Sequence, residues 1–355
     1  MSMTAGPNAV VVPRDAEIPQ EFQPRSLRKR ALQAAGALTV FIAIVVFAPG
    51  LGDVRGLLEK ADPGWLAVAV ALEGLSFASY IVMFGPIFCT GLTSRRSWQI
   101  GGSELAMGSL VPASGAGGLA LGAWILHRGG MGGERIARRS VAFALIKSGV
   151  NFVAVAVIGA AMALGLGPDQ PWYGTVLPAV VATACIGAVA LLPKLGRGEV
   201  DPDASLFRRS LGHTRIAVID GTAEAGKILR GGNLRVIAGS IGYWAFDNAV
   251  LWATYHSLGF SPPLTVILMG YLIGQLGGLL PIPGGVGGID LGLIGVLVAY
   301  GAPAAGTTAA VLAYHVILFW LPLVVGGLAF VQLRRDMPTG GELASCTPAI
   351  AAQTA

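Results

Sequence analysis

A glycine- and proline-rich stretch inside a long apolar region constrains the fold more than any other feature, and it reads Pro281-Ile282-Pro283-Gly284-Gly285-Val286-Gly287-Gly288-Ile289-Asp290. Proline removes a backbone donor and glycine has low helical propensity, so an α-helix cannot continue through it. In hydrocarbon, broken backbone is tolerated only where protein or a water-filled cavity satisfies its polar groups. The stretch therefore predicts a site inside a membrane protein.

A related break occurs earlier in the chain, at Pro112-Ala113-Ser114-Gly115-Ala116-Gly117-Gly118. The matching positions share one constant offset: Pro112, Gly115 and Gly118 with Pro281, Gly284 and Gly287, and Gly101, Gly108 and Leu110 with Gly270, Gly277 and Leu279. Six matches in one register favour an internal duplication. Interrupted apolar segments at corresponding positions of two halves indicate a transporter-type site.

The composition places the chain in a membrane. Of its 355 residues, 54% are hydrophobic and 12% charged, and the mean hydropathy is +0.69. The charged fraction is about half that of a soluble protein. The net charge of +5 comes from arginines clustered in loops, so it reports orientation and not nucleic-acid binding. The cysteines and histidines have no metal-ligand spacing, and we expect no metal and no cofactor.

Hydropathy and charge together predict an all-α polytopic membrane protein with about six full crossings. The expected spans are residues 31–49, 65–90, 140–164, 173–192, 236–258 and 307–331. Arginine-rich flanks place both termini in the cytoplasm. Residues 1–30 and 336–355 are expected to be disordered cytoplasmic tails, and the basic segment 194–235 a cytoplasmic linker between membrane halves 31–193 and 236–335.

The two broken segments are predicted to be re-entrant hairpins. The apolar region 97–126 lies between arginines and is too short for two crossings, which need about forty residues. It should therefore enter from the cytoplasmic face and return, with residues 112–118 at its tip. The region 264–300 should then enter from the outer face, with its break at 281–288, which gives an inverted repeat. Eight full crossings are the alternative.

Ionisable residues at membrane depth are functional candidates because they are costly to bury. Six qualify: Glu73, Glu104, Lys147, Asp247, Asp290 and His315. Half-helix N-termini after each break suit a phosphate or carboxylate. The predicted substrate-binding residues are Pro112, Gly115, Gly118, Lys147, Pro281, Pro283, Gly284, Gly285, Gly287 and Asp290. Possible proton carriers or charge partners are Glu73, Glu104, Asp247 and His315; aligning the helices after the breaks places Lys147 opposite His315.

Structural roles compete with each of these functional roles. Lys147 can form an ion pair with Glu73 or Glu104, and His315 can be a neutral histidine hydrogen-bonded between helices. Asp290 can cap the half-helix that follows the break. The glycines can simply allow close helix packing, although this does not explain the paired prolines.

The pattern P-x-P-G-G-x-G-G-[IV]-[DE] at Pro281 to Asp290, with the earlier break before the basic loop at 128–139, resembles the lysylphosphatidylglycerol synthase transmembrane (flippase-like) family. The resemblance covers the chain from about Arg30 to Arg335. It implies a membrane region with re-entrant helices that moves an aminoacylated phospholipid between leaflets. The family's best-known members carry an aminoacyl-transferase domain after this region, and since none is recognised here we expect no synthesis of lysyl-lipid.

The leading functional hypothesis is a flippase-like transporter of the cytoplasmic membrane. Its partners are membrane lipids, and its substrate is an anionic or aminoacylated phospholipid or a polyprenyl-phosphate-linked lipid. A membrane enzyme acting on a lipid-linked substrate is one alternative. An accessory protein of a cell-envelope pathway, docking a partner through residues 194–235 or forming a homo-oligomer, is another.

Overall fold

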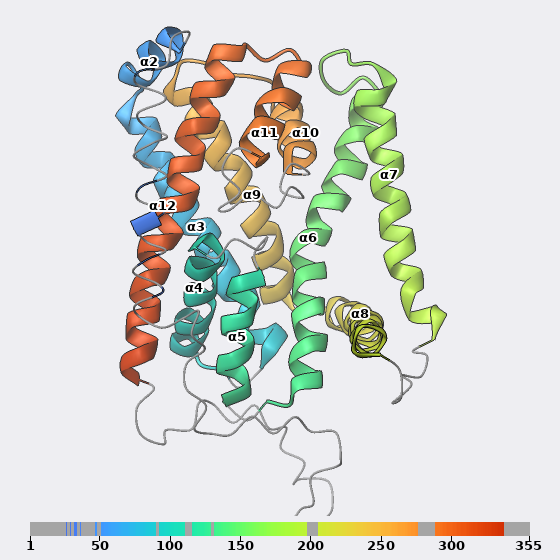
Figure 1. The fold of residues 1–355 in the computed structure, drawn as a ribbon. Helices are drawn as coiled ribbons and strands as arrows, with labels where there is room; N and C mark the ends of the chain where they lie inside the picture. Colours follow the sequence, from blue (N-terminus) through green and yellow to red (C-terminus); the bar gives the residue numbers. More distant parts are fainter. Residues whose placement is uncertain are drawn as a thin grey trace, which may run out of the picture.

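The computed structural model describes residues 51–89, 92–110, 116–128, 131–196, 205–275 and 288–336, with the single positions 26, 29, 32, 33, 36 and 47. Within these residues every regular element is a helix, and the long helices run side by side in a bundle (Figure 1). The predicted all-α membrane architecture is confirmed. Nearly all of the predicted tails and of the first span lies outside the described residues, as do residues 112–115 and 281–287 of the two breaks.

Four of the described helices are long and apolar enough to cross a bilayer. They are α3 (Pro63–Phe88), α6 (Gly133–Ala163), α7 (Trp172–Leu191) extended by η2 (Leu192–Leu195), and α12 (Ala304–Asp336). A fifth long helix, α9 (Leu234–Ser257), runs through the middle of the bundle (Figure 1). It is less apolar because it carries buried polar residues, including Asp247 and Asn248.

The four helices that flank the glycine breaks are shorter. They are α4 (Ser94–Leu110) and α5 (Ala116–Arg128) around the first break, and α10 (Leu264–Gly274) and α11 (Gly288–Ala299) around the second. With 11 and 12 residues, α10 and α11 have little more than half of the roughly 20 residues that a crossing needs. The first pair occupies the lower half of the bundle and the second the upper half (Figure 1). These lengths fit two re-entrant hairpins better than eight full crossings.

Helix contacts in one half of the chain have counterparts in the other. Helices α3 and α9 pack against each other. The first helix of each short pair packs on the long helix of the other half, α4 on α12 and α10 on α6. The second helix of each pair packs on the long helix that follows it, α5 on α6 and α11 on α12. Two helices outside the hairpins follow the same rule, since α2 (Gly52–Glu59) packs on α12 and α8 (Leu206–Arg230) packs on α6. Each of the two short-helix pairs thus packs against both α6 and α12.

Helix boundaries recur at the offset of 169 residues that separates Gly101 from Gly270. Moving α3 by this offset gives residues 232–257, where α9 spans Leu234–Ser257. Moving α6 gives residues 302–332, where α12 spans Ala304–Asp336. The offset found from glycines and prolines therefore also relates complete helices.

Glycines let the central helices approach closely. A Cβ atom at Gly239 of α9 would lie 2.8 Å from the Ser79 carbonyl oxygen of α3. A Cβ atom at Gly326 of α12 would lie 2.2 Å from the Gly102 carbonyl oxygen of α4. Because no side chain fits at either contact, these glycines are explained by packing, as is usual between membrane helices.

Helix α8 occupies most of the predicted linker 194–235, and the sequence reasoning did not anticipate it. It is 25 residues long and is seen nearly end-on beside the upright α6 and α7, so it lies across the direction of the spans (Figure 1). Gly221 seats it on α6, where an added Cβ would lie 2.5 Å from Val141 Cβ. Glu224 holds it there through Arg139 Nη2 at 2.8 Å.

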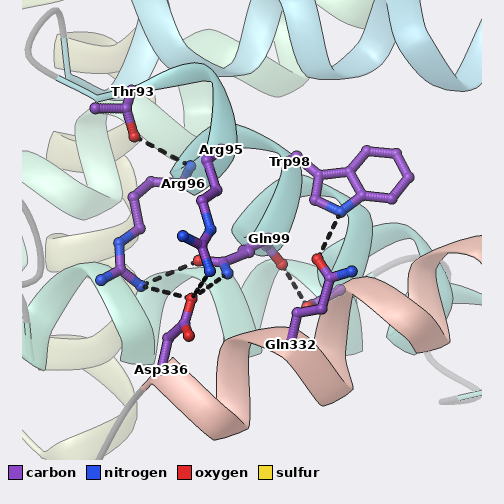
Figure 2. A network of polar contacts seen from close by, with 8 residues as sticks. Thr93, Arg95, Arg96, Trp98, Gln99, Gln332 and Asp336 are labelled. Carbon is purple, nitrogen blue, oxygen red and sulfur yellow. Dashed lines mark hydrogen bonds and ion pairs between the residues drawn. The ribbon is translucent and has the colours of Figure 1, made fainter.

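A polar network ties the beginning of α4 to the end of α12 (Figure 2). Asp336 Oδ2 accepts from Gln99 Nε2 at 2.6 Å and from Arg95 Nη2 at 3.0 Å. Trp98 Nε1 donates to Gln332 Oε1 at 3.3 Å one turn earlier on α12. The first hairpin is therefore fastened to the last helix of the chain at the lower end of the bundle.

Candidate functional site

Four of the six predicted ionisable residues interact across four helices. Glu73 lies on α3, Glu104 on α4, Lys147 on α6 and Asp247 on α9. Lys147 interacts electrostatically with Glu104 and Asp247, and Glu73 with Asp247. The three carboxylate residues are only 4% to 7% exposed. We call these four residues the central cluster; it combines one lysine with three carboxylates.

Lys147 lies between two aromatic rings. Its Nζ atom is 5.8 Å from the ring centroid of Tyr80 on α3 and 5.9 Å from that of Tyr243 on α9. An ammonium group within about 6 Å of such rings gains a cation–π attraction. Of the two ion-pair partners considered for this lysine, Glu104 is the one that interacts with it electrostatically.

Glu104 is held against the helix that follows the first break. A Cβ atom at Gly118 of α5 would lie 2.2 Å from the Glu104 carbonyl oxygen, and one at Gly122 would lie 3.0 Å from Glu104 Oε2. The predicted site residue Gly118 is therefore required for the close approach of α5 to α4. It positions the central cluster and has no side chain of its own with which to bind a substrate.

Asp247 connects α9 to both neighbouring elements of the second half. Its carboxylate accepts a hydrogen bond from the Tyr271 hydroxyl of α10, and its Oδ1 atom accepts another from the Tyr314 hydroxyl of α12 at 3.0 Å. The rings of Tyr271 and Tyr314 meet edge to face with centroids 6.5 Å apart. Asp247 thus links the second hairpin to the central cluster.

Two carboxylate oxygens of the central cluster are buried without a hydrogen-bond partner among the described residues. They are Glu73 Oε2 and Glu104 Oε2. A buried polar atom without a partner is costly, and such atoms usually meet a ligand, a proton or an ordered water. These two oxygens are therefore available to a group that enters the cluster.

Asp290 and His315 form a second polar contact, between α11 and α12. His315 Nδ1 lies 2.9 Å from Asp290 Oδ1. His315 is thus a histidine hydrogen-bonded between helices, one of the two roles considered for it. Asp290 sits in the first turn of α11, where a negative charge suits the helix dipole.

Seven of the predicted site residues lie outside the described residues: Pro112, Gly115, Pro281, Pro283, Gly284, Gly285 and Gly287. The helices beside them agree with the expected half-helices, since α5 begins at Ala116 and α11 at Gly288. Binding of a substrate by the broken backbone itself stays a prediction.

Sequence reasoning missed the tyrosines and Gly122. Tyr80 follows Glu73 by seven residues, and Tyr243 precedes Asp247 by four, spacings that put each pair on one face of a helix. Tyr271 and Tyr314 have no such neighbour on their own helices, and their role depends on how α10 and α12 pack against α9. Helical spacing around each buried acid would therefore have found two of the four tyrosines.

Replacing Asp247 with alanine should destabilise the protein by about 1 kcal/mol. The change removes the acceptor of two buried hydroxyl groups, and hydrogen bonds between membrane helices are each worth roughly 0.6 kcal/mol. Denaturation of the purified protein in mixed micelles measures the difference. Tyr314→Phe, which removes one of the two bonds, is the graded comparison and should lose about half as much. A variant as stable as the wild type would show that the carboxylate does not hold these helices together.

Comparisons with known proteins identify the family. The model of the lysylphosphatidylglycerol synthase TM region matches residues 33–326. A relative described as a UPF0104 membrane protein, from Methanothermobacter thermautotrophicus, is 30% identical over 99 residues. That match covers 28% of this chain and 28% of the relative.

Proposed function

Because the chain belongs to the family of the lysylphosphatidylglycerol synthase TM region, we propose that this multi-pass membrane protein is a flippase-like lipid transporter. The proposed substrate is a phospholipid whose headgroup carries a phosphate and an ammonium group, such as an aminoacylated phospholipid. The protein would move this lipid between the leaflets of the cytoplasmic membrane, passively or coupled to protons.

The central cluster is the observation that carries the proposal. Ionisable residues inside a membrane usually mark a substrate or ion pathway. Lys147 lies near the middle of α6 and Asp247 near the middle of α9, so the cluster is at the depth where a headgroup must pass. Both hairpins reach it, the first through Glu104 and the second through the bond from Tyr271 to Asp247.

The charges of the cluster favour a headgroup with both signs. Lys147 and the half-helix N-termini suit a phosphate. The carboxylates outnumber the lysine, and two of them have an oxygen without a hydrogen-bond partner in the described part of the chain. A purely anionic headgroup would leave these carboxylates without compensation at membrane depth. An ammonium group on the headgroup would supply the compensating positive charge. The rings of Tyr80 and Tyr243 already lie beside one ammonium group, that of Lys147.

We further propose that the two halves form an inverted repeat. The matched helix contacts, the constant offset and the positions of the hairpins in opposite halves of the bundle support it (Figure 1). Under this proposal the arginine-rich lower end, with the beginning of α6 and the end of α12, is cytoplasmic. The repeat boundary then falls between α6 and α7, earlier than the linker 194–235.

Cysteine labelling in sealed vesicles should place the two hairpins on opposite membrane faces. With all three native cysteines replaced, Ser94→Cys and Gly132→Cys mark the ends of the first hairpin, and Leu264→Cys and Ala304→Cys those of the second. An impermeant maleimide should reach the first pair from the cytoplasmic side only and the second pair from the outer side only. Labelling of all four positions from one side would refute the inverted arrangement.

Leaflet exchange in reconstituted vesicles tests the function. Vesicles with and without the protein receive fluorescent phosphatidylglycerol, its aminoacylated form or a polyprenyl phosphate, and dithionite quenching of the outer leaflet measures exchange. We expect the protein to speed exchange most for the aminoacylated lipid. Rates equal to those of empty vesicles for all three lipids would overturn the proposal. Mass analysis of the recovered lipids separates transport from catalysis, since a changed lipid mass would indicate the enzyme alternative.

A further inference from the structure

Helix α8 carries an apolar stripe that is only half covered. Phe207, Leu211, Val218, Thr222 and Ala225 follow one another at helical spacing on one face. In the second half of the helix this face is buried against α6, with Thr222 and Ala225 only 7% and 6% exposed. In the first half nothing described covers it, and Phe207 and Leu211 are 76% and 61% exposed.

The charges beside the uncovered half of the stripe are all positive. Arg208, Arg209 and Arg215 are exposed, and no acidic residue occurs between Ser205 and Ile219. The first acids of the helix come later, and Glu224 among them is engaged with Arg139 and Arg138 of α6. The first half of α8 therefore combines exposed apolar side chains with arginines that have no acidic partner among the described residues.

The orientation of α8 indicates that its first half lies at the surface of the bilayer. The helix lies across the direction of α6 and α7 (Figure 1) and contacts η2, where α7 ends. It is thus parallel to the plane of a bilayer spanned by those helices, at the level where one of them leaves it. Amphipathic helices with arginines beside an apolar face bind at this depth to membranes with anionic headgroups.

We propose that the first half of α8 is a docking surface for anionic phospholipids of the membrane in which the protein sits. Phe207 and Leu211 insert among the lipids, and Arg208, Arg209 and Arg215 contact their phosphates. Gly221 and Glu224 clamp the second half to α6, which fixes the depth of the first half. This inference does not depend on the proposed transport activity.

An environment-sensitive fluorophore on α8 of the full-length protein tests the proposal. In a cysteine-free background the label is attached at Leu211→Cys on the apolar stripe or at His213→Cys on the opposite face of the same turns. Vesicles contain phosphatidylcholine alone or with phosphatidylglycerol, and nitroxide quenchers are either attached to lipid or dissolved in water. We expect lipid-borne quencher to act several-fold more strongly at position 211 than at 213, and phosphatidylglycerol to increase the difference.

Substitution of Arg208 and Arg209 with glutamine should raise the phosphatidylglycerol content needed for half-maximal quenching at position 211 by about thirtyfold, because each of the two arginines near an anionic surface contributes roughly 1 kcal/mol. Lys60→Gln, at an exposed position directly after α2, should leave this content unchanged. Equal access of water-soluble quencher to positions 211 and 213 would overturn the proposal. So would protection of position 211 that grows with the protein-to-lipid ratio, since it would identify a second copy of the chain as the occupant.

Discussion

Lys147→Met is expected to lower the rate of lipid exchange at least about tenfold, because a charge-assisted hydrogen bond to a phosphate is worth roughly 1.5–3 kcal/mol. Methionine keeps the length of the side chain and removes its charge. The vesicle assay with the aminoacylated lipid measures the loss. Lys60→Met, which removes an exposed lysine from the end of α2, is the matched control and should exchange lipid at the wild-type rate.

A second variant separates substrate binding by Lys147 from a purely structural role. If the lysine only neutralises Glu104, the double variant Lys147→Met with Glu104→Gln removes both charges and should recover exchange. If the lysine binds the headgroup, the double variant should stay inactive although it is folded. Recovery would therefore contradict the proposed role of Lys147. Lys147→Arg, which keeps the charge and most of the geometry, should keep part of the activity.

Gly118→Val is expected to destabilise the protein by about 3 kcal/mol, the upper end of the usual cost of overpacking. Even the first added carbon would lie 2.2 Å from the Glu104 carbonyl oxygen. This atom belongs to the backbone of α4, so it cannot rotate away, and α5 must shift. The shift would also move Glu104 in the central cluster. Denaturation in micelles and the exchange assay should both detect the change.

Gly295→Val provides the control for a new branched side chain in a half-helix. Gly295 lies on α11, in the other hairpin, and an added Cβ there would meet no atom within 4 Å. Valine has a somewhat higher helical propensity than glycine, so in the present fold this variant should be at least as stable as the wild type. Equal stability of the two variants would show that α5 does not approach α4 as closely as described.

The division into long helices and two pairs of short helices could be predicted because it depends on local sequence, whereas the re-entrant course of these pairs stays a prediction. Glycines and prolines at a constant offset marked both breaks, and the length of the apolar regions excluded two crossings at the first. Arginines at the ends of the spans gave their boundaries, so that α3, α6, α7, α9 and α12 all lie close to the expected ranges.

The partners inside the site could not be predicted, because they depend on how each helix is rotated and packed. Both Glu73 and Glu104 were candidates for Lys147, and only the packing of the helices shows that Glu104 interacts with it. His315 contacts Asp290 on the neighbouring helix. Helix α8 was missed because its segment is polar on average, and the apolar stripe appears only when residues are followed at helical spacing.

The offset of 169 residues relates the helices but not the chemistry of the site. At the offset of 169 residues, Glu73 corresponds to Gly242, Glu104 to Ile273, and Asp247 to Ala78. Lys147 corresponds to Val316 at this offset, one residue away from the expected partner His315. The central cluster is therefore asymmetric within a symmetric set of helix contacts. Two halves that began alike would need only one set of charges to form a single site between them.

Photo-crosslinking of a lipid headgroup tests the central claim most directly. Vesicles are prepared with aminoacylated phosphatidylglycerol that carries a diazirine on the headgroup, and the crosslinked residues are mapped by mass spectrometry. We predict crosslinks to the buried faces of α3, α6 and α9 around Tyr80, Lys147 and Tyr243, and competition by unlabelled lipid. Crosslinks confined to exposed outer positions such as Val180 and Val181 of α7 would contradict a headgroup site at the central cluster.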